Sequence, residues 1–286
     1  MKFTKMQGCG NDYVYVNGFE EQIAKDEKTD LARRISDRHF GVGSDGLIFI
    51  NPSDIADFEM EMYNGDGSRA EMCGNGIRCV GKYVYDHGMT KGKEFTVESF
   101  GAVKHLTVVE EEEGRAKTLR VDMGSPILEA EKVPVSPKYF FVDPAESVVD
   151  APIEVDGNDY HVTCVSMGNP HAVVFIEDTD SLPIESIGPK FENHEAFPNR
   201  INTEFVQVID KGYVKMRVWE RGSGETLACG TGCCATAVAC ILNGKTDNKV
   251  TVEVLGGKIE IEWDREKDVI YMTGPGVTVF EGDYVI

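Results

Sequence analysis

Two cysteines occupy the same local pattern, each directly before a Gly-x-Gly that opens a helix-like segment. Cys73 precedes Gly74-Asn75-Gly76, and Cys229 precedes Gly230-Thr231-Gly232. Glycines there let several backbone N–H groups converge at a helix N-terminus, where they can bind a carboxylate. The same helix end stabilises a nearby thiolate and lowers its pKa. Each pattern therefore combines a potential base with a carboxylate-binding site.

Both patterns belong to a long internal repeat. MYNGDGSRAEMCGNGIRCVGKYV at residues 62–84 corresponds to VWERGSGETLACGTGCCATAVA at residues 218–239. Upstream, MQGCGNDYVYV at residues 6–16 corresponds to SMGNPHAVVFI at residues 166–176. A single Cys-Gly-x-Gly is more typical of a buried cysteine beside a tight turn, but two at equivalent positions favour catalysis. A repeat of this length predicts a duplicated domain rather than a solenoid.

The elements that must position these cysteines can be predicted from periodicity. Residues 76–87 and 232–243 are typical of helices ended by Gly88 and Gly244. The second is apolar on nearly every side, which predicts a buried helix. Half-buried strands are expected where apolar residues alternate, as at residues 106–109, 119–123, 215–219 and 258–262. We predict an α+β fold of two pseudo-symmetric domains, each a mostly antiparallel sheet or barrel wrapped around a central helix.

Proline density marks the connection between the halves. Five prolines fall within residues 126–152 and predict a linker with edge strands. We expect an N-terminal domain of residues 1–124 and a C-terminal domain of residues 125–275. If the domains face each other about a pseudo-two-fold axis, the two cysteines meet in an interdomain cleft. One thiolate can then remove an α-proton from one face of a carbon while the other thiol protonates the opposite face.

Composition excludes several classes of function. The 286 residues carry 29 Lys and Arg against 49 Asp and Glu, a net charge of −20. Such acidity disfavours binding to nucleic acid and to anionic membranes. No apolar run approaches a membrane span or a secretory signal, so we expect a cytoplasmic protein with no membrane partner. The eight cysteines contain no CxxC pair, so we expect no metal.

The sequence also resembles a known family in several specific segments. The segments GNDYVYV, DRHFGVGSDGLI, MYNGDGSRAEMCGNGIRC, GNPHAVVF, INTEFVQV, VWERGSGETLACGTG and GPGVTVFEGDY together resemble the diaminopimelate epimerase family. The resemblance implies an epimerase that uses no cofactor, neither pyridoxal phosphate nor metal. Its small-molecule substrate would be diaminopimelate, interconverted between the LL and meso forms on the route to lysine and peptidoglycan. It also implies a homodimer, and a C-terminal strand at residues 276–286 that returns to the N-terminal domain.

Residue roles follow from the resemblance, position by position. It implies that Cys73 and Cys229 are the acid/base pair, with Cys73 as the base for the LL isomer. His171 and Glu220 match residues that activate the thiols, and Arg221 matches the residue that grips the distal carboxylate. The substrate-binding residues it implies are Asn11, Asn64, Gly74, Asn75, Asn169, Asn202, Glu220, Arg221, Gly230 and Thr231. Some members carry glutamine where this chain has Gly46, so no side-chain role is expected there.

Alternative interpretations remain open at this stage. A proline-type racemase would not need the distal Arg221 contact, and such racemases usually carry histidine where this chain has Asn75. A non-enzymatic thiol or metal-binding protein would show redox-active thiols and no amino acid turnover. Asn64, in Asn-Gly-Asp-Gly, is as typical of a hairpin turn as of a substrate contact. Glu220 and Arg221 could also form an ordinary surface ion pair.

Overall fold

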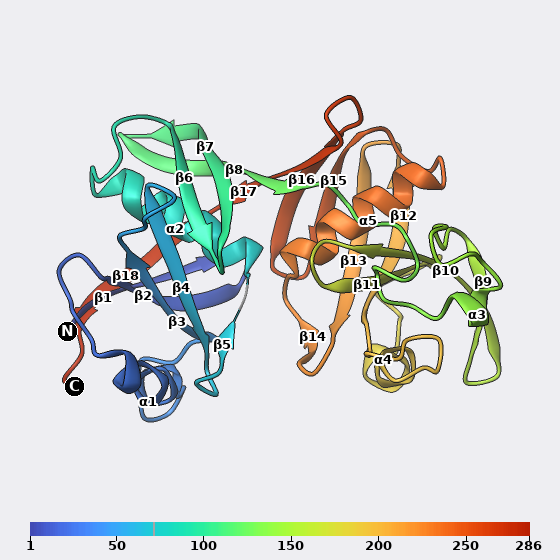
Figure 1. Cartoon of the computed structure of the whole chain (residues 1–286), viewed down its shortest axis with the longest axis horizontal. Coiled ribbons are helices and arrows are strands. Elements are labelled where there is room, and N and C mark those ends of the chain that lie inside the picture. The colour runs from blue at the N-terminus through green and yellow to red at the C-terminus, as the bar shows by residue number, and fades with distance from the viewer. Residues whose placement is uncertain (71) are drawn as a thin grey trace. The chain divides into compact units, whose positions relative to one another are not determined.

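The structure is a computed structural model that describes residues 1–70 and 72–286. The chain forms two compact units, unit 1 from Met1–Asp122 with Thr273–Ile286, and unit 2 from Met123–Met272. The two chain ends lie close together in unit 1 (Figure 1), because the last strand, β18 (Val277–Asp283), pairs antiparallel with β1 (Lys2–Gly8). The expected C-terminal strand is therefore present beside the first strand of the chain.

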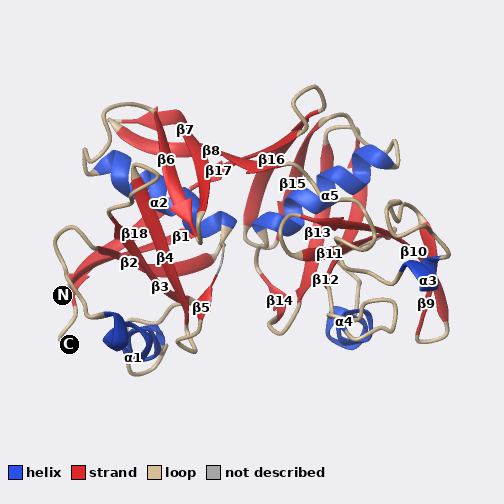
Figure 2. Cartoon of the chain, viewed as in Figure 1, coloured by secondary structure: helices blue, strands red, loops and turns tan. Residues whose placement is uncertain are grey.

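In unit 1 the strands surround one helix, α2 (Gly74–Asp86) (Figure 2). Most of its strand pairs are antiparallel, and the pairs β2–β3 and β4–β6 are parallel. Its remaining elements are β2 (Asn11–Asn17), α1 (Lys25–Ser36), β3 (Gly46–Asn51), β4 (Phe58–Asn64), β5 (Arg69–Ala70), α2 (Gly74–Asp86), β6 (Glu94–Ser99), β7 (Ala102–Glu112) and β8 (Arg115–Gly124).

Unit 2 repeats this arrangement. Its parallel pairs are β11–β12 and β13–β15, the counterparts of the two parallel pairs in unit 1. Its elements are α3 (Pro137–Phe140), β9 (Ala151–Val155), β10 (Asn158–Ser166), β11 (Pro170–Phe175), α4 (Ile184–Glu192), β12 (Asn202–Asp210), β13 (Tyr213–Glu220), β14 (Gly224–Thr226), α5 (Gly230–Leu242), β15 (Lys249–Val254), β16 (Gly257–Asp264) and β17 (Val269–Pro275). The predicted class, α+β with mostly antiparallel sheets around a central helix, is confirmed for each unit.

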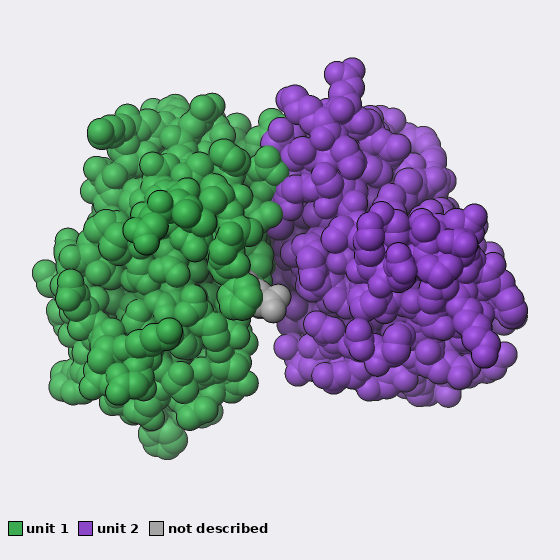
Figure 3. All heavy atoms as spheres, in the orientation of Figure 1, with its two compact units in different colours: residues 1–122, 273–286 green, residues 123–272 purple. Residues whose placement is uncertain are grey.

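The chain passes from one unit to the other inside two strands. The boundary after Asp122 lies in β8, and the boundary after Met272 lies in β17. Figure 3 colours unit 1 green and unit 2 purple. The proline-rich segment 126–152 follows the first boundary and holds little regular structure beyond α3 and the start of β9. No helix among the described residues is long and apolar enough to cross a membrane.

The two central helices, α2 in unit 1 and α5 in unit 2, are buried along most of their length. Every residue of α2 from Gly74 to Val84 is buried, as is every residue of α5 from Gly230 to Cys240. Gly81 shows how closely the strands approach α2, because a Cβ there would lie 2.6 Å from Leu119 Cδ2. Both helices begin two residues earlier than periodicity predicts, directly after Cys73 and Cys229. Each cysteine is thus the N-cap of a buried helix.

Candidate active site

Cys73 caps the start of α2. Its sulfur accepts a hydrogen bond from the Gly76 backbone N–H at 3.2 Å. The thiol in turn donates to Asn11 Oδ1 at 3.0 Å. Gly76 lies in a tightly packed place, since a Cβ there would lie 3.3 Å from Cys73 Cβ and 3.0 Å from Ile48 Cδ1. The thiol therefore sits at a helix N-terminus with a polar amide beside it, as the sequence pattern predicts.

Charged residues on neighbouring segments hold Asn11 in place. Its Nδ2 donates to Asp45 Oδ2 at 2.7 Å, and Arg38 Nη2 donates to Asp45 Oδ1 at 2.8 Å. Arg38 also donates to Asp12. Burial raises the pKa of Asp12, but the hydrogen bonds from Arg38 and Lys5 outweigh it, and the pKa lies below its ordinary value. Asp12 therefore stays ionised and anchors the start of β2.

Arg78 braces the first turn of α2 from inside. Its side chain is completely buried, and it donates to Asn75 Oδ1 at 2.9 Å and to the Gly74 carbonyl at 3.2 Å. A third hydrogen bond, of 3.2 Å, reaches the Pro275 carbonyl at the end of β17. The predicted carboxylate-binding amides of Gly74 and Asn75 are thus held on a helix turn locked by one buried guanidinium.

The structure supports a turn role for Asn64 and explains the glycine at position 46. Asn64 Nδ2 donates to Ser68 Oγ at 3.0 Å across the turn between β4 and β5. Gly46 pairs with Asn64 across β3 and β4. A Cβ on Gly46 would lie 2.1 Å from the Tyr63 carbonyl oxygen. No side chain, glutamine included, fits at position 46 on this backbone.

Cys229 caps α5 in a more enclosed and more acidic setting. Its sulfur accepts from the Gly232 N–H at 3.4 Å and lies 3.5 Å from Thr231 Oγ1. Burial raises the pKa of the Cys229 thiol well above its ordinary value, and the nearby charges of Glu220 and Glu204 raise it further. The expectation that the helix N-terminus lowers this pKa is therefore wrong for Cys229, because burial and the two carboxylates outweigh it. The ground state of this thiol is protonated, which suits a proton donor.

A fully buried histidine–carboxylate pair lies next to Cys229. His171 Nδ1 is 2.7 Å from Glu204 Oε1, and neither side chain is exposed to solvent. The other ring nitrogen, Nε2, is 3.0 Å from Asn169 Oδ1. A His171 ring nitrogen, a Glu204 oxygen and Cys229 Sγ all lie within 4.8 Å of one another. Among the described residues this is the cluster that could hold a metal ion, and its N, O and S donors would suit zinc.

Glu204 is the residue that the sequence analysis missed. It stands two residues after Asn202, and alternate residues of a strand face the same side of a sheet. That spacing was available in the sequence segment INTEFVQV. The signal that could have identified it is a glutamate on the same strand face as Asn202 in a largely apolar segment, because carboxylates are rarely buried without a partner.

The end of β13 places Glu220, and the turn that follows it places Arg221. Burial raises the pKa of Glu220, opposed by hydrogen bonds from Thr226 and Cys229 and by the charge of His171. Asn202 ties this turn to β11, since its Oδ1 accepts from the Arg221 N–H at 2.9 Å and its Nδ2 donates to the Pro170 carbonyl at 2.7 Å. The Arg221 guanidinium is exposed and donates to the Asn199 carbonyl at 3.1 Å.

The predicted site residues therefore form one group in each unit. In unit 1 the group comprises Asn11, Cys73, Gly74 and Asn75, whereas the Asn64 side chain is hydrogen-bonded to Ser68 in the turn between β4 and β5. In unit 2 it comprises Asn169, His171, Asn202, Glu220, Arg221, Cys229, Gly230 and Thr231. Each group gathers at the N-terminus of the buried helix of its unit.

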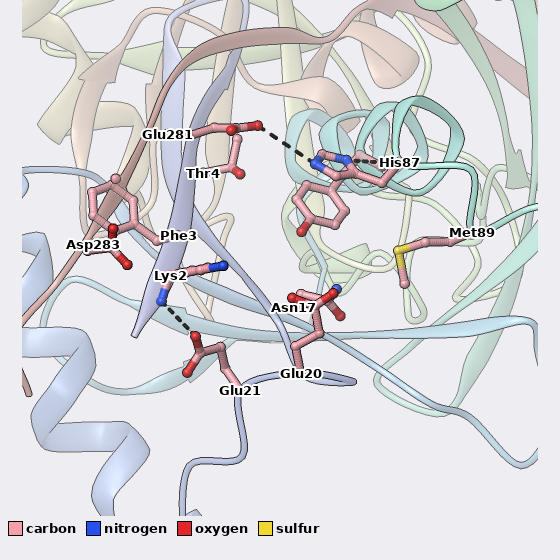
Figure 4. Close-up of a pocket in the computed structure, with 12 residues that line it drawn as sticks. Lys2, Phe3, Thr4, Asn17, Glu20, Glu21, His87, Met89, Glu281 and Asp283 are labelled. Atoms are coloured by element: carbon pink, nitrogen blue, oxygen red, sulfur yellow. Dashed lines mark hydrogen bonds and ion pairs between the residues drawn. The ribbon is translucent and has the colours of Figure 1, made fainter.

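A separate cavity of about 490 Å³ lies in unit 1, away from both groups. Figure 4 shows its polar lining, which includes Lys2, Asn17, His87 and Glu281, with His87 Nε2 3.7 Å from Glu281 Oε1. None of the residues predicted from the sequence lines it.

Comparison with known proteins supplies independent information. The sequence profile of the family described as Diaminopimelate epimerase matches residues 3–129 and 163–279. A diaminopimelate epimerase from Acetivibrio thermocellus is 55% identical over 99% of this chain and 98% of that protein. One from Agathobacter rectalis is 56% identical over 99% of both chains.

Solved structures agree in fold at low sequence identity. A PhzF-family phenazine biosynthesis protein from Bacillus anthracis matches with a TM-score of 0.69 at 16% identity, covering 100% of this chain and 99% of that chain. A hydroxyproline epimerase from Agrobacterium vitis matches with a TM-score of 0.67 at 14% identity, covering 99% of this chain and 90% of that chain. At such identities the likeness concerns the fold alone.

Proposed function

The chain belongs to the diaminopimelate epimerase family, and from that premise we propose that it interconverts LL- and meso-diaminopimelate by proton transfer between two cysteines and one α-carbon. The observation that carries the proposal is the duplicated cap. Cys73 and Cys229 each begin a buried helix and each accept the N–H of the residue three positions later. The two relatives described above are named diaminopimelate epimerases, and their sequences are 55% and 56% identical to this chain. The reaction is an isomerisation and needs no electron carrier.

In the proposed mechanism one cysteine, as thiolate, removes the α-proton and the other, as thiol, protonates the opposite face of the same carbon. The α-carboxylate of the substrate binds to the backbone N–H groups at the two helix starts, Gly74-Asn75 and Gly230-Thr231. Negative charge moves into that carboxylate as the carbanion forms. N–H groups that already point at the carboxylate stabilise this charge more in the transition state than in the ground state.

The two thiols have different partners for their protons. Cys73 donates to Asn11, a neutral amide that cannot take the proton. Cys229 lies beside His171 and Glu220, and the thiol-to-carboxylate hydrogen bond lowers the otherwise raised pKa of Glu220. We assign His171 and Glu220 to proton transfer at Cys229, because an imidazole and a carboxyl group are the usual partners of a catalytic thiol.

The remaining polar residues are assigned to the unreacting end of the substrate. Diaminopimelate carries an amino acid group at both ends, so the site must read the distal one stereospecifically. Arg221 is suited to its carboxylate because a planar guanidinium forms paired hydrogen bonds. Asn11, Asn64, Asn169 and Asn202 supply neutral donors and acceptors. A proline-type racemase needs no such distal contact.

We also propose a cytoplasmic homodimer within lysine and peptidoglycan precursor biosynthesis. Exposed apolar side chains on β18 support an association surface there, because Val277, Val279 and Phe280 are all exposed. Exposed apolar side chains gathered in one place are typical of a surface covered by a partner. The solution mass of the chain, 31.6 kDa for one copy, tests this directly, and a monomer at working concentration would contradict it.

The test of function is turnover without added cofactor. Reduced protein is incubated with LL-diaminopimelate, and the product isomers are separated on a chiral column. The proposal expects meso-diaminopimelate to accumulate to an equilibrium mixture, with full activity after exhaustive dialysis against a chelator. Turnover of proline or hydroxyproline in place of diaminopimelate would transfer the assignment to the proline-type racemases.

A further inference from the structure

The two units present the same strand positions to their cysteines, which makes differences between them informative. In unit 2, His171 pairs with Asn202 across the parallel strands β11 and β12, and Glu204 lies two residues further along β12. In unit 1, Tyr13 pairs with Gly46 across β2 and β3, and Ile48 lies two residues further along β3. Residues two apart in a strand share a face. Glu204 and Ile48 are therefore structural counterparts.

Contacts with the capped helices confirm this equivalence. A Cβ on Gly232 would lie 2.6 Å from Glu204 Oε1, and a Cβ on Gly76 would lie 3.0 Å from Ile48 Cδ1. Each side chain thus packs against the second glycine of its Cys-Gly-x-Gly. The same site that holds a methyl group beside Cys73 holds a carboxylate beside Cys229.

A carboxylate is a costly choice for this position. Glu204 is completely buried, and its Oε2 has no hydrogen-bond partner among the described residues. A buried carboxylate with an unsatisfied oxygen destabilises a fold relative to an apolar side chain of similar size. Unit 1 shows that an apolar residue serves the packing. The charge of Glu204 therefore calls for a chemical reason.

That reason lies in His171. Its Nδ1 faces Glu204 Oε1 and its Nε2 faces Asn169 Oδ1, so both ring nitrogens face acceptor oxygens. A carboxylate that accepts from Nδ1 fixes the orientation of the imidazole ring and the nitrogen that carries its proton. Glu204 is that carboxylate. Tyr13, the counterpart of His171, has an apolar Ile48 in the corresponding place.

We propose that Glu204 is a positioning residue of the epimerase, whose buried carboxylate holds the His171 imidazole in the orientation that serves Cys229. The inference rests on the proposed function and deepens it. It makes the half-reaction at Cys229 depend on a His–Glu pair, whereas the half-reaction at Cys73 has no such pair at the matching positions. Proton removal and return by the two cysteines are then chemically distinct, although the two units share one architecture.

The test isolates each cysteine. Cys73→Ala leaves only Cys229, and Cys229→Ala leaves only Cys73. Each variant can still exchange the α-proton of one isomer for solvent deuterium without inverting it. We expect Glu204→Gln to slow exchange about 10- to 100-fold in the Cys73→Ala background, the usual cost of losing a group that orients an active imidazole. In the Cys229→Ala background the exchange rate should stay unchanged.

Two further variants guard against misfolding. Glu204→Ile introduces the residue that unit 1 carries at the same position, so it should fold and still slow exchange by Cys229. Thr203→Val alters the adjacent buried residue, whose side chain faces the other side of β12, and should change neither rate. Equal slowing in both single-cysteine backgrounds, or no slowing in either, would overturn the proposal.

A substrate-independent measurement separates this inference from the function. Iodoacetamide alkylation of Cys73 and Cys229 is followed by peptide mass spectrometry over a series of pH values. Because the charge of Glu204 raises the Cys229 pKa, Glu204→Gln should move the midpoint for Cys229 downward and leave the midpoint for Cys73 in place. If wild-type protein exchanged no diaminopimelate, the proposed function would fail. An unchanged pH midpoint for the alkylation of Cys229 would contradict the role of Glu204 and would leave the proposed function untouched.

Discussion

Among the individual residues, the two thiols that the proposed mechanism needs lie in different surroundings. Cys73 is partly exposed and hydrogen-bonded to a neutral amide. Cys229 is buried among groups that hold its proton. The same cap geometry therefore places two thiols in different surroundings, and at Cys229 burial and the nearby carboxylates raise the pKa of the thiol. A pair in which one member is thiolate and the other thiol is what inversion at carbon requires.

Removing either thiol should stop inversion of the α-carbon, while the remaining thiol still exchanges the α-proton of one isomer with solvent. Cys73→Ala and Cys229→Ala are each expected to lose epimerisation by at least about a thousandfold, because a missing acid or base cannot be replaced from the same side. Coupled measurement of isomer ratio and deuterium content checks this. Near-native epimerisation by either variant would exclude a two-base mechanism.

Arg221 should act on binding more than on chemistry. Arg221→Met is expected to raise KM for diaminopimelate about 10- to 100-fold with a smaller change in kcat, since charge-assisted hydrogen bonds of about 1.5–3 kcal/mol are lost from both ground and transition states. Steady-state kinetics give the two constants separately. A fall in kcat at unchanged KM would assign Arg221 to the reacting end instead.

At the scale of elements, strand β3 shows how backbone packing limits the site. Gly46→Gln should destabilise the protein by about 1–3 kcal/mol or more, because its Cβ would meet the Tyr63 carbonyl at 2.1 Å. Gly92→Ala is the matched control, as nothing lies within 4 Å of its added Cβ. Urea denaturation of both variants measures the difference. A Gly46→Gln protein as stable as wild type would show that β3 can move away from β4.

The buried helices also predict a dependence of stability on pH. Burial raises the pKa of Cys79 in α2 from 9.0 to about 11, and that of Cys240 in α5 to about 12. Their folded pKa values exceed the unfolded one, so the stabilisation is complete below about pH 9 and is lost as pH rises towards the folded values. Each thiol should contribute a loss of about 1.4 kcal/mol per pH unit in that window.

Replacing one thiol tests this dependence. Cys240→Ala should be less stable at neutral pH because of lost packing, yet should lose less stability than wild type between about pH 9 and about pH 11. Denaturant titrations at several pH values give the slope. Identical slopes for the two proteins would show that Cys240 does not titrate with unfolding.

At the scale of the whole molecule, the sequence repeat predicted most of the architecture. The duplicated Cys-Gly-x-Gly predicted two helices that begin close to it, and the apolar character of α5 on nearly every side predicted its burial; both are confirmed. The repeat is recognised from the residues that the two halves have in common. Glu204 escaped notice because it is where they differ, with isoleucine in the other half. Strand pairing, which a single sequence does not provide, made that difference visible.

Other features also needed the folded chain. Asp45 reaches Asn11 across 34 positions of sequence, and Arg78 reaches Pro275 across 197. Such contacts depend on long-range packing that local spacing cannot indicate. The site residues themselves were predictable because their motifs are short and local to the two helix starts.

Two bases that act on opposite faces of one carbon leave a distinct isotope pattern in the first turnover in deuterium oxide. LL-diaminopimelate is converted briefly, and the deuterium content of product and of unreacted substrate is measured. We expect meso product that carries deuterium at the inverted carbon from its first appearance, while remaining LL substrate is still protiated. Product that retains the original proton at that carbon would show that a single base carries it across, and would exclude the two-base mechanism.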